Sequence, residues 1–313
     1  MNIEIIEPCG YSKTFSNLLR VAEEARASFP NSNIVLLGGL LNGEQVKIEL
    51  NKLKVNIVDI PYEGFEDYLK NVDVETLIIT SPYGIEEKLI KIMKRRKILY
   101  FIATSPSTLE KEKLIKKAHF GKKIIFVGNL NTIEENYLAA STNHKFLFYD
   151  LSNENNANNA AILNQKFNSK RTEIIYQSEV ANESLSLALH KIKNYLPKAN
   201  INNEVSDENY EKKKALSDKL KDNDVLLIAS TTKKSDKYLL EYYHLNTKNV
   251  LYATISSVTD AIQLNISQEK KIYLISDGSI SRKTIDDICF YFRYKGVQGD
   301  LLDRQTKSVV QNF

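Results

Sequence analysis

The sequence contains few cysteines, no long apolar run and no block of like charges, and each absence argues against a class of protein. Cys9 and Cys289 are its only cysteines, too few for a disulfide framework and consistent with a reducing compartment. No window approaches the about eighteen apolar residues of a membrane-spanning helix, and the N-terminus lacks a charged-then-apolar signal pattern. The net charge of +4 comes from interspersed Lys and Glu, which gives nucleic-acid binding little support. We therefore expect a soluble cytoplasmic protein that binds neither membranes nor nucleic acids.

Motifs for nucleotides and metal ions are missing as well. The only Gly-Gly pair, Gly38-Gly39, has neither the Lys-Ser/Thr of a Walker loop nor the glycine spacing of a dinucleotide-binding turn. The four histidines show no metal-ligand spacing. We therefore predict no nucleotide site and no metal site from these motifs.

Strand-like and helix-like segments alternate along most of the chain. With 313 residues, of which 42% are hydrophobic, the chain can bury a substantial core. Most strand-like segments are unalternating apolar runs, which is typical of parallel strands covered by helices on both faces, so we predict the α/β class. After a strand at residues 3–6, the predicted strands are Ile34–Leu37, Val55–Ile60, Thr76–Thr80, Leu99–Ala103, Ile124–Val127, Phe146–Asp150, Glu173–Tyr176, Val225–Ser230, Asn249–Ala253 and Lys271–Ser276. The predicted helices are Phe15–Ala25, Ile85–Lys94, Leu109–Ala118, Ser184–Tyr195, Tyr210–Leu220, Lys237–Tyr243 and Thr284–Tyr294.

The chain is organised around its first strand, turn and helix. The turn runs from Cys9 to Thr14, and Gly10 marks the junction. A helix N-terminus that follows a strand leaves backbone N–H groups unpaired beside the positive end of the helix dipole, which suits an anion. Ser12, Lys13 and Thr14 are therefore candidate ligand-binding residues. The alternative is that the serine or threonine is an ordinary helix N-cap.

Three turns of this kind resemble the iron-ligand turns of the 4-hydroxy-3-methylbut-2-enyl diphosphate reductases, the LytB-type (IspH-type) family of isoprenoid synthesis. They are Pro8-Cys9-Gly10-Tyr11-Ser12-Lys13-Thr14, Ala103-Thr104-Ser105-Pro106 and Val205-Ser206-Asp207. The resemblance covers nearly the whole chain. It implies three α/β lobes with mostly parallel sheets, in a quasi-threefold trefoil around a central cavity. The corresponding boundaries are 1–103, 104–204, and 205–313 with the C-terminal tail.

Serine stands at all three positions where the family has a cysteine ligand. Ser12, Ser105 and Ser206 offer hard, essentially un-ionised oxygens, whereas the irons of such a cluster are matched by soft thiolates. We therefore expect no iron–sulfur cluster, no other metal and no cofactor, and we predict that the reductase activity is lost. The three serines remain candidate ligand-binding residues.

Other family positions have changed too. The three substrate-contacting histidines of the family correspond to Asn42, Tyr83 and Thr132. The phosphate-gripping Ser-Ser-Asn corresponds to Lys233-Lys234-Ser235, and the serine of the last phosphate loop corresponds to Ile280, beside Asp277. Diphosphate recognition as the family performs it is therefore not expected. Lys233, Ser235, Asn42 and Thr132 are predicted to line a different pocket, for a small polar or anionic ligand.

Glu134 keeps the position of the family's proton-relay glutamate. The alternative is a solvated glutamate at a helix start, where the helix dipole favours it. A carboxyl group in a partly apolar cavity can act as a general acid or base, so Glu134 is the predicted catalytic residue, with Tyr83 as a second. Gln177, Ser178 and Glu179 occupy the family's Gln-Thr-Thr position and are predicted ligand contacts near the same cavity.

Three functions follow from these residues. The first is a cluster-free LytB-like protein with a rebuilt pocket, acting as a non-redox enzyme or binding protein of specialised metabolism. The second is a non-catalytic pseudoenzyme with a regulatory or partner-binding role, which an exposed apolar patch would favour. The third, retained reductase activity, is the least expected. The sequence names neither the ligand nor the oligomeric state.

Overall fold

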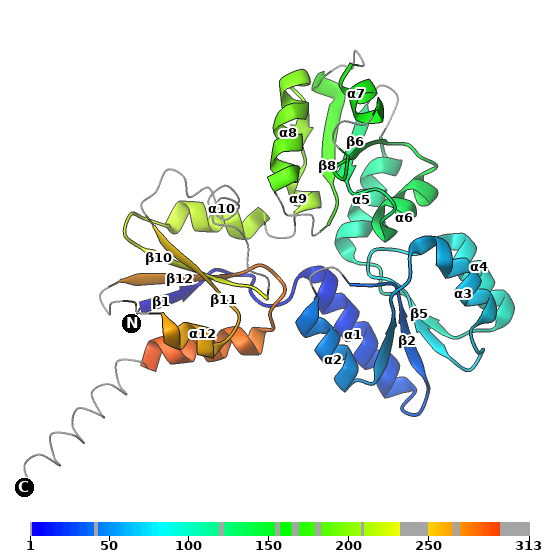
Figure 1. Ribbon diagram of the computed structural model, residues 1–313, viewed down its shortest axis with the longest axis horizontal. Helices are drawn as coiled ribbons and strands as arrows, with labels where there is room; N and C mark the ends of the chain where they lie inside the picture. The colour runs from blue at the N-terminus through cyan, green and yellow to red at the C-terminus, as the bar shows by residue number, and fades with distance from the viewer. Residues whose placement is uncertain are drawn as a thin grey trace, which may run out of the picture. The chain divides into compact units, whose positions relative to one another are not determined.

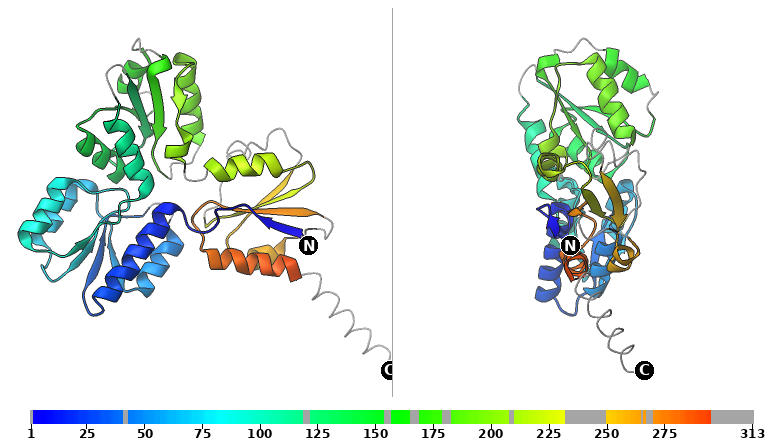
Figure 2. Two further views of the ribbon diagram at one scale, coloured as in Figure 1. Left: turned by 180° about the vertical axis from the view of Figure 1, so that it is seen from behind. Right: turned by 90° about the vertical axis from the view of Figure 1, so that its left-hand side faces the viewer.

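The described part of the chain contains three four-stranded sheets, and all their strands are parallel. The computed structural model describes residues 2–40, 43–118, 122–153, 157–164, 169–178, 183–207, 210–231, 250–264, 266 and 270–294 (Figure 1). Helices cover both faces of each sheet (Figure 2). The chain divides into two compact units, Lys13–Tyr210 on one side and Met1–Ser12 with the segment from Glu211 onward on the other. Within the described residues, no helix is both long and apolar enough to cross a membrane.

The first lobe belongs to the unit Lys13–Tyr210 and has the strand order β3-β2-β4-β5. Its core lies between the sheet and α3 and α4, and includes Leu37, Phe65, Leu89 and Met93. Helix α1 is amphipathic and buries Phe15, Leu18, Val21, Ala22 and Ala25. The strands are β2 (Ile34–Leu37), β3 (Val55–Val58), β4 (Leu77–Ile79) and β5 (Tyr100–Phe101). The helices are α1 (Lys13–Ser28), α2 (Glu44–Lys52), the 3-10 turn η1 (Tyr62–Gly64), α3 (Phe65–Asn71) and α4 (Glu87–Arg96).

The second lobe, in the same unit, has the strand order β7-β6-β8-β9. Apolar clusters on the two faces of its sheet are centred on Tyr149 and Ile174 on one face and on Phe126 and Leu138 on the other. The strands are β6 (Lys123–Gly128), β7 (Leu147–Asp150), β8 (Thr172–Tyr176) and β9 (Asn200–Ile201). The helices are α5 (Pro106–Lys116), α6 (Ile133–Thr142), α7 (Ala157–Asn164), the 3-10 turn η2 (Ser169–Arg171), α8 (Glu183–Tyr195) and α9 (Asn203–Ser206).

The third lobe lies in the other unit and has the strand order β1-β12-β10-β11. Its core includes Leu227, Leu274, Ile288 and Phe292. The strands are β1 (Asn2–Ile5), β10 (Val225–Ala229), β11 (Leu251–Ile255) and β12 (Lys271–Ser276). Its helices are α10 (Tyr210–Lys219), α12 (Val258–Gln263) and a last helix over residues 282–294.

The parallel α/β class predicted from the sequence is confirmed, and all the predicted strands are present with boundaries shifted by a few residues. The sequence analysis did not predict β9, α2, α3, α6, α7, α9 or α12, which are short or weakly periodic. The helix predicted at Lys237–Tyr243 lies outside the described residues.

The first strand belongs to a different sheet from the one expected. Residues 1–103 were predicted to form one lobe, but β1 pairs with β12 in the third lobe, in the register Asn2↔Lys271 to Ile5↔Leu274. Ile3 lies in the third-lobe core, and Glu4 forms ion pairs with Lys219 and Lys271. The apolar and charged side chains of β1 therefore contact residues that are more than two hundred positions away in the sequence.

Candidate functional site

Three polar side chains meet inside the second lobe. The Lys111 ammonium donates to Glu134 Oε1 at 2.8 Å and to Ser178 Oγ at 2.8 Å. The Ser178 hydroxyl donates to Glu134 Oε1 at 3.0 Å, and the Ser178 backbone N–H donates to Glu134 Oε2 at 2.7 Å. Lys111 and Glu134 are 0% and 1% exposed. This cluster, called the Lys111 triad below, is therefore a buried ion pair bridged by a serine.

Each member of the Lys111 triad comes from a different element. Lys111 lies on α5, Glu134 lies in the first turn of α6, and Ser178 follows β8. Helices α5 and α6 pack against each other, which brings the two charges together. The triad is thus assembled by tertiary packing and ties the two helices to the end of a sheet strand.

Two side chains near Glu134, those of Thr132 and Gln177, accept hydrogen bonds from backbone N–H groups. Thr132, a predicted ligand residue, is the N-cap of α6 and accepts from the Glu135 N–H at 3.3 Å. Gln177 Oε1 accepts from the Asn129 N–H at 2.8 Å, which joins the loop after β6 to the end of β8. Both Gln177 and Ser178 are buried. These contacts fix where α6 begins beside the ends of the two strands.

The sequence prediction included Glu134 and Ser178 but missed Lys111. A signal was present, because Lys111 and Ile115 are four residues apart in the predicted helix and therefore share one face of it, which in α5 is buried. A lysine on the buried face of a helix is rare unless it is paired with an anion. That position could therefore have predicted a carboxylate partner, although not which one.

Ser105 caps helix α5 with its side chain. Its hydroxyl oxygen accepts from the Thr108 N–H at 3.2 Å, and it lies 3.0 Å from both Ser107 Oγ and Thr108 Oγ1. Pro106 follows at the first helical position, where its missing N–H costs nothing. Ser105 is therefore the N-cap of α5.

Ser206 has a different structural contact. Its hydroxyl oxygen accepts from the Tyr176 N–H at 3.0 Å. Tyr176 is the last residue of β8 and lies two residues before Ser178. Helix α9, which carries Ser206, packs against α5. Both second-lobe serines are buried, and both hydroxyls are used inside the protein.

Ser12 lies in the other compact unit, in a turn held against the end of β12. Its N–H donates to the Gly278 carbonyl at 2.9 Å, and the Ser276 hydroxyl donates to the Gly10 carbonyl at 2.9 Å. Gly278 has φ +94°, and a Cβ there would lie 2.9 Å from Ser12 Cβ, so the close approach needs glycine. That Ser12 meets the two second-lobe serines in one cavity stays a prediction.

The remaining predicted residues fall into two groups. Lys13 and Thr14 begin α1, and Tyr83 is buried in the turn after β4, where its N–H donates to Ser81 Oγ at 3.1 Å. Four predicted residues lie outside the described residues: Asn42, Glu179, Lys233 and Ser235.

In the loop that follows β12, the Asp277 carboxylate accepts hydrogen bonds from neighbouring serines. The Asp277 carboxylate accepts from Ser230 Oγ at 2.5 Å, from the Ser279 N–H at 3.0 Å and from Ser279 Oγ at 2.6 Å. Ile280 is fully buried in the third-lobe core. The hydroxyls of this loop therefore bind a carboxylate of the chain itself.

The donors present do not fit an iron–sulfur cluster. Ser105 and Ser206 are hard oxygen donors, and their lone pairs accept backbone N–H groups. Burial raises the pKa of the Cys9 thiol and raises that of Cys289 to about 11, which disfavours the thiolate that a metal needs. Among the described residues, no three His, Cys, Asp or Glu side chains gather where they could hold a metal ion.

The chain is similar to proteins of one family. Its sequence matches the LytB protein family over residues 3–293. A solved structure of the E-1-hydroxy-2-methyl-but-2-enyl-4-diphosphate reductase from Plasmodium falciparum is 18% identical, with a TM-score of 0.62 over 92% of this chain and 86% of that one. A structure of (E)-4-hydroxy-3-methyl-but-2-enyl diphosphate reductase is 15% identical, with a TM-score of 0.61 over 93% of this chain and 99% of that one. No curated protein sequence matches.

Proposed function

Since the chain belongs to the LytB protein family, we propose that it is a non-catalytic member with a regulatory or partner-binding role. The observation that carries the proposal is the Lys111 triad. Both oxygens of Glu134 already accept hydrogen bonds within the protein, and the carboxylate is 1% exposed. A general acid or base must reach the proton it transfers, directly or through one water. A buried carboxylate that accepts three hydrogen bonds from its own protein serves stability better than catalysis.

Residue chemistry at the three serine positions supports the loss of reductase activity. Cluster irons take thiolate ligands, and a hydroxyl group near neutral pH is neither soft nor ionised. Ser105 is used as a helix cap and Ser206 as an acceptor at a strand end. Restoring one thiol would therefore remove a local hydrogen bond without completing a ligand set.

A second candidate is the non-redox enzyme or binding protein for a small polar or anionic molecule. The Ser178 hydroxyl favours it, because this group lies 2.8 Å from an ammonium and 3.0 Å from a carboxylate. A hydroxyl between a base and a cation can lose its proton to the base while the cation stabilises the oxygen. This candidate requires a ligand to reach Ser178, which is buried.

Anaerobic cluster reconstitution tests the proposed loss of redox chemistry. Purified protein should take up no stoichiometric iron and sulfide, should show no visible absorbance band of a cluster, and should not reduce 4-hydroxy-3-methylbut-2-enyl diphosphate. The matched control is the triple variant Ser12→Cys, Ser105→Cys and Ser206→Cys, which provides the thiols. A wild-type protein that reconstitutes and turns over this diphosphate would overturn the proposal.

The enzyme candidate is tested at Glu134 itself. The Glu134→Gln variant keeps the shape of the side chain but cannot transfer a proton. If a non-redox activity is found, loss of about a hundred- to ten-thousand-fold in that variant, with the fold intact, would favour the enzyme. Full activity in the variant would leave Glu134 as a structural residue.

A further inference from the structure

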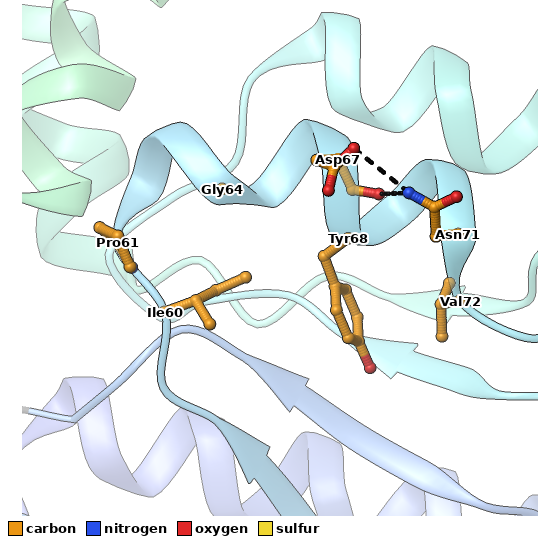
Figure 3. A pocket seen from close by; sticks show the side chains of 7 residues that line it. All are labelled: Ile60, Pro61, Gly64, Asp67, Tyr68, Asn71 and Val72. Atoms are coloured by element: carbon orange, nitrogen blue, oxygen red, sulfur yellow. Dashed lines mark hydrogen bonds between the residues drawn. The ribbon is translucent and has the colours of Figure 1, made fainter.

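A groove of about 510 Å³ lies in the first lobe, between α3 and the chain that leaves β3 (Figure 3). Its lining is mostly apolar and includes Ile60, Pro61, Tyr68 and Val72, with Gly64 in the wall. The Tyr68 ring points from α3 toward the sheet, between Ile60 and Val72 (Figure 3). The volume falls in the range of sites that hold a drug-sized molecule or a few side chains, about 300–1,000 Å³.

The chain segment that lines the groove follows an edge strand, β3. β3 is at the end of the strand order β3-β2-β4-β5, so among the strands that the structure describes only β2 pairs with it. An edge strand presents N–H and C=O groups that an extended peptide can use to add a strand. Peptides bound in this way place some side chains in pockets near the edge, and Ile60 and Pro61 of this groove follow β3 by two and three residues.

The chain around the groove is strongly acidic. Residues 59–75 contain six carboxylates and one lysine, although the whole chain has a net charge of +4. Glu66 forms an ion pair with Lys70, and in the described part of the chain no ion pair links a cation to Asp59, Glu63 or Asp67. Asp67 itself lines the groove and accepts from the Asn71 side chain at 3.2 Å. An apolar groove beside carboxylates that form no ion pair within the described residues is complementary to a ligand that is apolar and basic.

We propose that this groove and the edge of β3 dock an extended peptide segment of a partner protein, with apolar side chains flanked by lysine or arginine. The peptide backbone pairs with β3, its apolar side chains pack on Tyr68, Ile60 and Val72, and its basic side chains face Asp67 and the neighbouring carboxylates. The proposal rests on the proposed partner-binding role and names the chemistry of the partner. It uses no residue of the Lys111 triad.

The probe is a fluorescein-labelled peptide with a short leucine and valine core between lysine pairs, followed by fluorescence anisotropy with the full-length protein. Binding should saturate, and it should weaken when salt rises from about 0.05 M to about 0.5 M, because the carboxylates are exposed to screening. The same peptide with glutamate in place of lysine, or with proline at its centre, should bind at least about tenfold more weakly.

The chain offers two matched pairs of variants. Gly64 has φ −79°, and a Cβ there would meet Ile60 only at ordinary contact distance, so Gly64→Leu should fill the groove while keeping the fold. It should lower the peptide affinity at least about tenfold, the effect of losing one packed anchor. Asp67→Asn should lower both the affinity and its salt dependence, whereas Glu23→Gln, at an exposed carboxylate on α1, should change neither.

Three results would overturn the inference: no saturable binding, equal binding of the glutamate peptide, or binding unchanged by Gly64→Leu in a protein whose melting curve is unaltered. None of these results bears on the loss of reductase chemistry, because the lining of the groove includes none of Ser12, Ser105 and Ser206. Conversely, a wild-type protein that proved to be a reductase would leave a measured peptide affinity in place.

Discussion

At the residue scale, Lys111 and Glu134 depend on each other more than any other charged pair in the described part of the chain. Theirs is the only ion pair there in which both side chains are fully buried. Removing charges from water is costly, and the two Ser178 hydrogen bonds to the carboxylate offset part of that cost. Either charge left alone would have no comparable partner.

Loss of one member of this pair should therefore destabilise the protein strongly. Lys111→Met or Glu134→Gln should lower the free energy of unfolding by about 3–5 kcal/mol, because each leaves a buried charge without its partner. The double variant Lys111→Met/Glu134→Gln should recover a large part of the loss. Urea unfolding of the wild type, the two single variants and the double variant measures the coupling energy.

A surface pair provides the control for that cycle. Arg20 and Glu24 form an exposed ion pair on α1, and Arg20→Met should cost less than about 1 kcal/mol. Coupling between Lys111 and Glu134 no larger than that of the surface pair would show that the triad is not a structural tie.

At the element scale, two helices of the second lobe begin at residues whose family counterparts are a cofactor ligand and a substrate contact. Ser105 caps α5 and Thr132 caps α6. A capping side chain must accept a backbone N–H, and serine and threonine do so well, whereas a thiol is a weak acceptor. The residue types in this chain therefore suit capping.

Replacing Ser105 by the family's residue should test this role. Ser105→Cys should destabilise the protein by about 1 kcal/mol, close to the effect of Ser105→Ala, since neither side chain accepts the Thr108 N–H well. Thermal unfolding of the three proteins under reducing conditions gives the comparison. If Ser105→Cys is as stable as the wild type, the hydroxyl is dispensable as a cap.

At the scale of the whole molecule, the unit boundaries show which parts of the chain need one another. The unit Lys13–Tyr210 contains two complete sheets with their helices, whereas the third sheet takes β1 from the other end of the sequence. Ile3 on that strand lies in the third-lobe core. The third lobe is therefore incomplete without the first residues of the chain.

Fragments should reproduce this division. Residues 13–210 expressed alone should fold cooperatively, and residues 211–313 alone should not, because an edge of their sheet and part of their core are missing. Fusing residues 1–12 after residue 313 through a flexible linker should restore folding of the second fragment. Circular dichroism and hydrogen exchange follow the outcome, and a stable fold of residues 211–313 without β1 would contradict this assignment.

Much of the architecture is encoded locally. Apolar runs such as Ile34–Leu37 and Val225–Ala229 predict buried parallel strands because the pattern that buries both faces is contained in each run. The turn sequences around Ser12, Ser105 and Ser206 were enough to indicate the family, and their residue types were enough to predict the loss of thiolate ligands. These inferences depend only on neighbours in the chain.

Contacts between distant segments could not be obtained in that way. Lys111, Glu134 and Ser178 are 23 and 44 residues apart along the chain, and only the packing of α5, α6 and the end of β8 makes them partners. The sequence likewise predicted a strand at residues 3–6, observed as β1 at Asn2–Ile5, but the sheet that receives β1 depends on its pairing with β12. Local patterns specify which face of an element is apolar, whereas only the tertiary structure decides which other element covers that face and which buried charges must pair.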